Sequence, residues 1–314
     1  MKACISHESA IEYWRIQRAL PPGSARRARV SLPSSPPPTE MMVNAGLSLP
    51  VHIVLDSADG RWSSKTMKQH VFSGKTPAAC FVDRGDGVFV SSPEFSFLQM
   101  ASEIPLIKLI ELGYELCGIY SLPTAGDPEP PERGFYKRKP LTSTKKLDAF
   151  IAGMPGSRGR KKALRALRFI ANGAASPMET KLSILLTLPY LLGGFGLAMP
   201  ELNSRIVPTK TAKASSSKTF YACDLYWPGF GLAVEYDSDL QHTGSAKIAE
   251  DAKKKNALNL IGVEVITVTK LQLYSSPELE KVAKIIATYL GKRLKFDNPG
   301  FSAAHRELRD QLLS

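Results

Sequence analysis

Two carboxylates interrupt apolar runs in the C-terminal part of the chain, and they are the strongest candidates for chemistry. Asp224 lies in Cys-Asp-Leu-Tyr-Trp-Pro, and Glu235 lies in Leu-Ala-Val-Glu-Tyr-Asp. A buried carboxylate is costly unless it binds a cation or is well hydrogen-bonded. The Pro228-Gly229 pair between them predicts a tight turn that folds two strands together and brings both acids close. Two converging carboxylates suit Mg²⁺ (or Mn²⁺), with water and phosphate oxygens as further ligands.

Three other side chains are candidates for the same centre. Glu179 lies in the first turn of a helix predicted to begin after Ser176-Pro177, and Asp237 follows Glu235 on the same strand face. His242 comes shortly after this strand and could relay a proton near neutral pH. Each has a plainer interpretation, as a helix-terminus acid, a strand terminator and a surface histidine respectively.

Hydrophobic periodicity predicts the elements that position these residues. The C-terminal pattern reads helix, strand, strand, helix, strand, helix, over residues 177–192, 218–227, 231–237, 246–261, 263–268 and 276–290. The uncharged stretch 182–199 is interrupted by Pro189 and three glycines, so a buried helix that ends in a loop is preferred to a membrane span.

The chain as a whole is predicted to be an α/β protein, of the α+β type overall. Residues 1–135 should form a smaller α+β domain, with an amphipathic helix over 5–20, β-like runs, and helical periodicity from Phe97 to Leu112. We expect a basic helical connector over 136–175, a catalytic domain over 176–293 and a partly helical tail over 294–314.

The net charge of +12 is concentrated in one segment, because Lys137–Arg168 holds eleven basic residues and one acid. Such a run attracts phosphate without reading bases, although a solvated linker is an equally good interpretation. The candidate nucleic-acid contacts are Arg158, Arg160, Lys161, Lys162, Arg165, Lys254 and Lys255. The polar segment Thr209–Lys218 is a weaker candidate, and a plain surface loop is favoured there.

Four scattered cysteines lack C-x-x-C spacing, which argues against a zinc knuckle or a disulfide framework and fits a reducing cytoplasm. Glu8 and Glu12 stand where a signal peptide would be apolar. We therefore expect a cytoplasmic protein without a membrane partner, and we leave any protein partner open.

Residues 176–293 resemble the PD-(D/E)XK superfamily, in the uncharacterised branch related to very-short-patch-repair (Vsr) endonucleases. The resemblance is carried by Ser-Pro-Met-Glu (176–179), Asp-Leu-Tyr-Trp-Pro (224–228), residues 234–242, Asp251 with Lys254, and residues 262–269. It implies a restriction-endonuclease-like mixed sheet flanked by helices.

The resemblance also implies roles for single residues. Asp224 would be the central metal ligand, Glu235 the second acid and Glu179 the helix acid. Asp237 and His242 would stand where Vsr-like enzymes place a metal-site or proton-transfer group. The signature lysine, two residues after the second acid, is replaced by Asp237. Vsr-like members also lack that lysine, and His242 or a migrated Lys254 would have to substitute for it.

Residues 1–135 resemble, more weakly, the AbiE-type antitoxin-like modules found in front of such domains. The resemblance rests on residues 6–14, 51–55 and 90–93 and on His70. It implies a DNA-binding or regulatory module. We expect His7 and His70 to be structural and not catalytic.

These observations favour a Mg²⁺-dependent endonuclease that hydrolyses double-stranded DNA, in repair, restriction or phage defence. The alternative is a catalytically inactive DNA-binding regulator or antitoxin-like protein with a nuclease fold. An RNA-directed nuclease ranks lower, because no aromatic platform for stacking single-stranded bases is evident.

Overall fold

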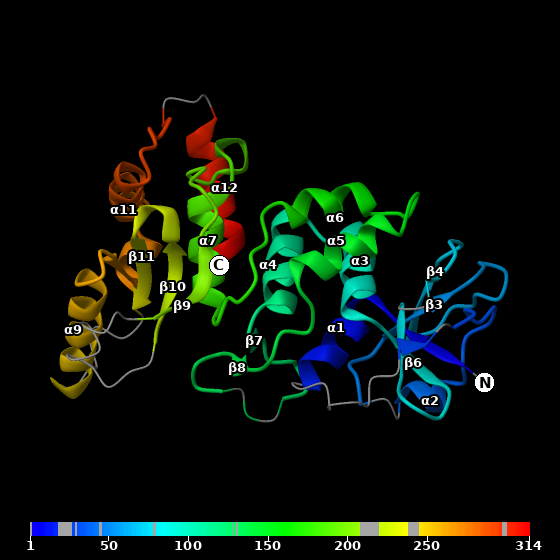
Figure 1. Cartoon of the computed structure of the whole chain (residues 1–314). Coiled ribbons are helices and arrows are strands. Elements are labelled where there is room, and N and C mark those ends of the chain that lie inside the picture. Colours follow the sequence, from blue (N-terminus) through cyan, green and yellow to red (C-terminus); the bar gives the residue numbers. More distant parts are fainter. Residues whose placement is uncertain are drawn as a thin grey trace. The chain divides into compact units, whose positions relative to one another are not determined.

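The computed structural model divides the chain into two compact units, Met1–Ile170 (unit 1) and Ala171–Ser314 (unit 2) (Figure 1). Each unit combines helices with a sheet of parallel and antiparallel strands, which confirms the expected α+β class. The structure describes residues 2–17, 27–28, 30–43, 46–77, 80–127, 129, 131–207, 220–237, 245–296 and 300–314. For residues 42–43 and 245–248 it describes the backbone alone.

Unit 1 is built on a six-stranded sheet with the strand order β2-β5-β6-β1-β3-β4. Its strands are β1 (Ala3–Ile5), β2 (Arg27–Ala28), β3 (Val51–Leu55), β4 (Met67–Val71), β5 (Phe81–Asp83) and β6 (Val88–Ser91), with a separate pair, β7 (Tyr120–Ser121) and β8 (Tyr136–Lys137). Its helices are α1 (His7–Ile16), α2 (Thr39–Val43), α3 (Pro93–Glu103), α4 (Leu106–Cys117), α5 (Thr144–Ala152) and α6 (Arg160–Leu167). Strand β3 is buried along its whole length, as the apolar run Val51–Leu55 predicts for an interior strand.

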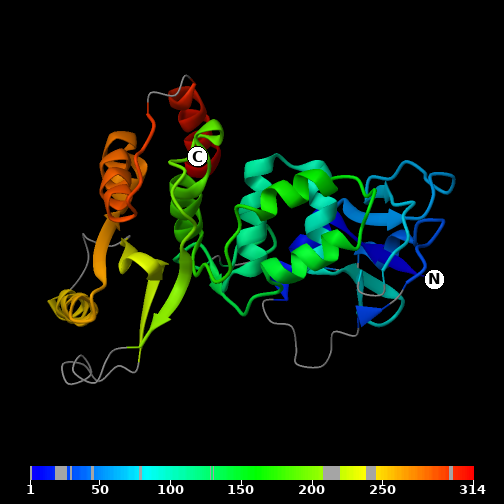
Figure 2. The same ribbon diagram turned by 45° about the horizontal axis from the view of Figure 1, so that its top comes forward.

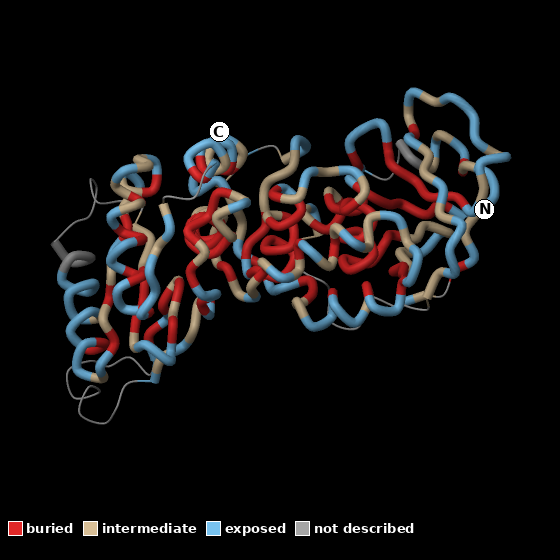
Figure 3. The backbone as a smooth tube through the Cα atoms, turned by 90° about the horizontal axis from the view of Figure 1, so that it is seen from above, coloured by how far each residue is buried: buried red, intermediate tan, exposed pale blue. Residues whose placement is uncertain are grey.

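The helical periodicity from Phe97 to Leu112 resolves into two helices, α3 and α4. The break falls at Ile104-Pro105, because proline disfavours a helical conformation in the residue before it. Ser92 caps α3 by accepting a hydrogen bond from the backbone N–H of Phe95 at 3.2 Å. Helix α3 is buried on nearly every side, so it belongs to the core of unit 1. Figure 3 shows the buried parts of the backbone in red.

Residues 136–175, expected as a basic connector, contribute two packed helices to unit 1. Helices α5 and α6 pack against α3 and against each other, and α6 also packs against α4 (Figure 2). Leu147 and Ile151 of α5 and Ala163 and Ala166 of α6 are the buried residues. These apolar positions hold the segment in the helical layer, and Arg158, Lys161, Arg165 and Arg168 are exposed.

Unit 2 has a four-stranded sheet with the order β12-β11-β10-β9, in which β11 and β12 are parallel and β10 is antiparallel to both its neighbours. The strands are β9 (Glu201–Ile206), β10 (Tyr221–Trp227), β11 (Leu232–Asp237) and β12 (Glu264–Thr269). The helices are α7 (Pro177–Thr187), η1 (Tyr190–Leu192), η2 (Pro228–Phe230), α9 (Ser245–Asn259), α10 (Lys270–Tyr274), α11 (Ser276–Tyr289) and α12 (Phe301–Leu313).

The sequence patterns located most of unit 2, but α7, β9 and α10 differ from the expectation, since no helix was expected over Lys270–Tyr274. The helix expected over 177–192 ends at Thr187, because Pro189 cannot continue it, and a short 3₁₀ turn follows. Strand β9 has a mostly polar sequence and was not expected. Residues 301–313 of the tail form α12, which packs alongside α7 (Figures 1 and 2). None of the helices among the described residues has the length and apolar character needed to cross a membrane.

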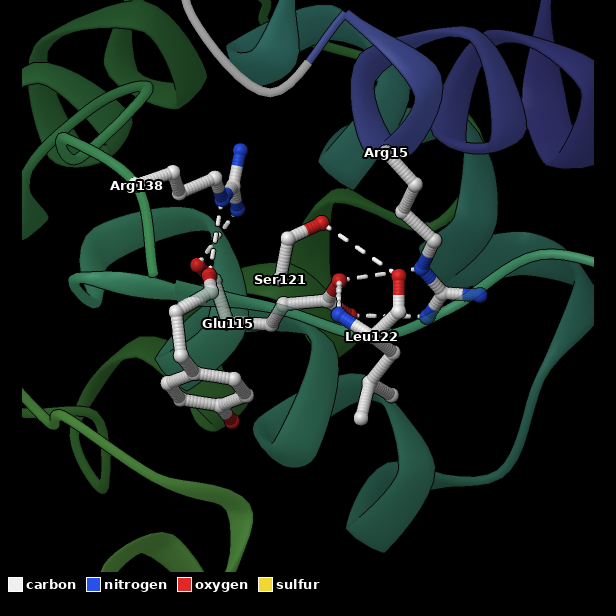
Figure 4. A network of polar contacts seen from close by, with 6 residues as sticks. Arg15, Glu115, Ser121, Leu122 and Arg138 are labelled. Carbon is white, nitrogen blue, oxygen red and sulfur yellow. Dashed lines mark hydrogen bonds and ion pairs between the residues drawn. The ribbon is translucent and has the colours of Figure 1, made fainter. Parts of the chain in front are cut away.

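A buried ion pair between Arg15 of α1 and Glu115 of α4 connects these helices to Leu122 and Arg138 (Figure 4). Glu115 of α4 is 2% exposed and accepts hydrogen bonds from Arg15 Nε at 2.9 Å and Nη2 at 2.7 Å. The backbone N–H of Leu122 donates to the same carboxylate at 3.1 Å, and Arg138 Nη2 donates to the Glu115 carbonyl at 2.7 Å. Burial raises the pKa of Glu115, but the charge and hydrogen bonds of Arg15 outweigh burial, so the pKa lies below its usual value.

We predict that Arg15→Met destabilises unit 1 by about 3 kcal/mol at pH 7, because it leaves a buried carboxylate without its main partner. The lowered pKa means that the wild-type contribution is complete above the unfolded pKa of about 4.3 and is lost as the pH falls through the folded pKa. Denaturant unfolding between pH 3 and pH 7 measures the difference, which should shrink on acidification. A double variant Arg15→Met/Glu115→Leu should recover part of the loss, and a pH-independent effect of Arg15→Met alone would contradict this explanation.

Candidate active site

Asp224 lies in the middle of β10, at a point where the ladder to both neighbouring strands is interrupted. The register pairs Cys223 with Ser204 and Leu225 with Leu202, so Asp224 stands opposite Asn203 of β9. Toward β11 the register ends at Leu225, and beyond it Asp224 Oδ2 accepts a hydrogen bond from the backbone N–H of Tyr236 at 2.8 Å. The carboxylate therefore replaces a backbone acceptor and connects β10 to β11.

Glu235 of β11 forms an ion pair with Lys254 of α9. Lys254 Nζ lies 2.7 Å from Glu235 Oε2, and both side chains are about four-fifths shielded from solvent, with exposures of 23% and 21%. Helix α9 is held over the sheet because Ala257 and Leu258 pack on Cys223 and other buried residues of the strands. The other oxygen of Glu235, Oε1, is buried and accepts no hydrogen bond from any residue that the structure describes.

Glu179 is fixed at the beginning of α7 by its own backbone and by β9. Ser176 caps the helix by accepting from the backbone N–H of Glu179 at 3.1 Å, as the sequence predicts. The Glu179 carboxylate turns back, and its Oε2 accepts from the Ala175 N–H at 2.8 Å and from Asn203 Nδ2 at 2.7 Å. Asn203 has a positive φ of 49°, an uncommon conformation that asparagine tolerates better than most residues.

The three carboxylates interact electrostatically, although each comes from a different element. The pKa of Asp224 is raised well above its usual value, mainly by burial and then by the negative charges of Glu179 and Glu235. Burial is also the main cause of the raised pKa of Glu179, and the charge of Glu235 adds to it. Burial lowers the pKa of Lys254, but the charge and hydrogen bond of Glu235 raise it more, so the ammonium form is favoured. One lysine thus faces three acids, and the cluster carries an excess of negative charge.

This charge excess determines how a cation would fit. Three carboxylates with one ammonium require either a shared proton or a bound cation at neutral pH. Among the described residues, only His7, His70 and Glu103 bring three ligand atoms within 4.8 Å of one another, so the acids of unit 2 are more widely spread. A Mg²⁺ ion held by Asp224 and Glu235 would therefore need water and substrate oxygens for the rest of its shell, which is common for this ion.

The other site residues predicted for unit 2 differ in their position and burial. Asp237 ends β11 and is half-buried, with Thr269 as its register partner, and Lys255 is exposed on α9 next to Lys254. His242 and the segment Thr209–Lys218 lie outside the described residues. Asp251 is exposed on α9, and Lys254, three residues later on the same helix, forms its ion pair with Glu235 of β11.

The five basic candidates from residues 158–165 all lie in unit 1. Arg158, Lys161 and Arg165 are exposed and remain candidates for phosphate contacts. Arg160 Nε donates to the carbonyl of Ile151 at 3.1 Å, and Lys162 Nζ donates to the carbonyl of Ile104 at 3.0 Å. These last two residues help to hold the helices of unit 1 together.

Sequence reasoning did not identify Asn203 or the thiol of Cys223 as neighbours of the site. Burial, followed by the nearby charge of Glu235, raises the pKa of Cys223 to about 12, so it stays a neutral thiol beside the acids. Asn203 belongs to β9, whose polar sequence carries no strand periodicity. The only sequence signal for Asn203 is its residue type, which is frequent at irregular backbone positions.

Comparison with known proteins gives no match for this chain. No protein-family model, no curated protein and no solved structure matches it. The assignment of a function therefore rests on the residues of the site and their geometry.

We predict that Asp224→Asn stabilises unit 2 in the presence of EDTA, by about 1–3 kcal/mol or a few degrees in melting temperature. Asparagine keeps an acceptor for the Tyr236 N–H and removes a buried charge that two other acids oppose. The raised pKa of Asp224 means that its carboxylate costs stability as the pH rises through the folded pKa, so the gain should be largest at neutral pH and fade on acidification.

Calorimetric unfolding in EDTA measures this gain. Asp310→Asn is the matched control, because Asp310 is an exposed acid of α12 in the same unit. A lower melting temperature for Asp224→Asn than for this control would show that Asp224 is a stabilising structural acid.

Proposed function

We propose that unit 2 is a metal-dependent endonuclease domain of the PD-(D/E)XK type, related to Vsr endonucleases, which hydrolyses phosphodiester bonds of double-stranded DNA. The observation that carries the proposal is the cluster of Asp224, Glu235 and Lys254, drawn from β10, β11 and α9. An acid on one strand, an acid on the next and a lysine in hydrogen-bond contact with the second acid are the three groups that such an enzyme requires.

Lys254 supports the proposal because it can replace the signature lysine that this sequence lacks. Asp237 occupies the position of the signature lysine, but the ammonium group of Lys254 reaches Glu235 from the neighbouring helix. A lysine that approaches from α9 can supply the same positive charge next to the second acid. The functional group would be retained while its position in the sequence has changed.

Asp224 and Glu235 would hold Mg²⁺ or Mn²⁺, and the unpartnered Oε1 of Glu235 is a ready ligand. When bound, the ion would polarise a phosphoryl oxygen and lower the pKa of a coordinated water. Lys254 would orient the attacking water or stabilise negative charge that develops on the phosphate. Glu179, held by the Ala175 N–H and Asn203, would keep the site acidic and position β9 against α7.

The DNA would be bound by positive charge that does not read sequence. Arg158, Lys161 and Arg165 are exposed in unit 1, and Lys255 is exposed on α9. Such contacts neutralise phosphates and make binding weaker as the salt concentration rises. A role in repair, restriction or phage defence would each use this combination of backbone binding and metal-dependent cleavage.

One observation favours a second candidate, a DNA-binding regulator with an inactive nuclease fold. Lys254 is engaged by Glu235, and the three carboxylates are too widely spaced to form a compact ligand set of three. A protein of this kind would retain DNA binding after loss of the acids and would show no cleavage with any divalent ion.

We predict that the purified protein nicks or linearises supercoiled plasmid with Mg²⁺ or Mn²⁺, and that EDTA or Asp224→Asn abolishes the reaction. Asp310→Asn should cleave like the wild type. Lys254→Met should lower the rate about 10²- to 10³-fold, the usual cost of losing one group that stabilises transition-state charge. Lys253→Met, an exposed neighbour on α9, is its control.

Gel retardation in EDTA separates the two candidates. Intact plasmid with either metal, together with retardation that Asp224→Asn does not change, would contradict the nuclease and support the regulator. Cleavage that persists in Asp224→Asn would place the active site elsewhere.

A further inference from the structure

Three of the five histidines of the chain meet in unit 1, far along the sequence from one another. His7 is the first residue of α1, His52 lies in β3 and His70 lies in β4. The rings of His7 and His70 are stacked with their centroids 3.5 Å apart, and the His52 ring lies 5.0 Å from that of His70. Such a concentration of imidazoles is typical of metal centres.

Glu103, the last residue of α3, completes a set of possible ligands. His7, His70 and Glu103 each offer one ligand atom, and these atoms all lie within 4.8 Å of one another. His7 is buried, His70 is half-buried and Glu103 is exposed, so the group runs from the core to the surface. An ion from solvent can therefore reach the imidazoles from the side of Glu103.

Neighbouring side chains contact one nitrogen of each ring in this cluster. His7 Nδ1 lies 2.9 Å from Ser6 Oγ, and His70 Nε2 lies 3.2 Å from His52 Nδ1. Each ring has a second nitrogen that can bind an ion once the rings turn. Hydrogen bonds to the nitrogen that does not bind are how proteins set the tautomer and direction of metal-binding histidines.

The backbone at His7 is held in an uncommon conformation. Its φ is +49°, and its backbone N–H donates to Gln99 Oε1 at 3.2 Å. Strain of this kind persists where the surrounding structure imposes it, and it is frequent at functional sites. The imidazole of this residue is the one that stacks on His70.

Electrostatics favours the neutral, metal-binding form of both rings. Burial, followed by the neighbouring imidazoles, lowers the pKa of His7 to about 2 and that of His70 to about 4.

A cavity of about 230 Å³ adjoins the cluster and lies within unit 1. Its lining includes His7, His70, Gln99, Glu103 and Arg158. An ion held by three protein ligands would therefore face a space that admits water or another small ligand at its remaining position. Sites with three protein ligands and one open position are the kind found at zinc centres that bind or transform a ligand.

We propose that His7, His70 and Glu103 bind a divalent transition-metal ion of the zinc class, with His52 and Ser6 as orienting partners. The two imidazoles turn out of their stacked arrangement when the ion binds, because the lone pair of each nitrogen lies in the plane of its ring. This site is independent of the proposed nuclease centre, which lies in unit 2 and uses carboxylates suited to Mg²⁺.

The test is zinc binding by the full-length chain after EDTA treatment and dialysis, measured by calorimetry and by metal analysis. All proteins carry Asp224→Asn, so that the carboxylates of unit 2 do not contribute. The expected result is one Zn²⁺ per chain, with affinity at least about 100-fold weaker in Glu103→Gln and in His70→Ala, since loss of an orienting partner alone costs about 10- to 100-fold. Glu8→Gln, an exposed acid next to His7, is the matched control and should bind like its parent.

Cobalt substitution gives an independent readout. Co²⁺ bound by the parent should show visible absorption from a low-coordinate site, and this absorption should be lost in Glu103→Gln, which replaces an exposed side chain by one of the same size. No stoichiometric Zn²⁺ in the parent, or equal binding by Glu103→Gln and Glu8→Gln, would overturn the proposal.

Discussion

The concentration of negative charge around Asp224 is the constraint on which the architecture of unit 2 depends. A carboxylate in the middle of an apolar strand removes a backbone pairing and must be compensated locally. Each of the three acids has its own partners. The N–H of Tyr236 donates a hydrogen bond to Asp224, and Asn203 and the α7 terminus hold Glu179. Lys254 of α9 forms an ion pair with Glu235. The irregular backbone of β9 and the packing of α9 on the sheet both serve this cluster.

Glu115 of unit 1 is a buried acid with a structural role, and it differs from Asp224 in how its charge is compensated. Glu115 is only 2% exposed, yet Arg15 and Leu122 bind its carboxylate oxygens and its pKa is lowered. Asp224 has the opposite balance, because burial and the charges of two neighbouring acids raise its pKa by more than the Tyr236 N–H and the charge of Lys254 lower it. An acid left under-compensated in this way is a common property of sites that bind a cation or transfer a proton. The difference between these two environments is the physical basis of the functional proposal.

The sequence predicted the elements of unit 2 better than their interactions. Strands β10 and β11 and the Ser176-Pro177 cap were predicted correctly, because apolar runs and capping are local properties. The partner of Lys254 could not be predicted, because it depends on the tertiary packing that places Glu235 within reach. The histidine cluster of unit 1 could not be predicted either, because His7, His52 and His70 follow no motif spacing. They meet only because the folded sheet brings β3 and β4 beside α1. Polar β9 gave no periodic signal at all.

The central claim is that Asp224 and Glu235 bind a divalent cation, and Mn²⁺ binding followed by electron paramagnetic resonance tests it most directly. The full-length chain with His70→Ala, which removes the histidine cluster as a competing site, is titrated with Mn²⁺ with and without Asp224→Asn. The account predicts bound Mn²⁺ in the first protein, displaced by excess Mg²⁺, and loss of that binding in the second. Equal Mn²⁺ binding by the two proteins, or none in either, would contradict the assignment of this cluster as a metal site.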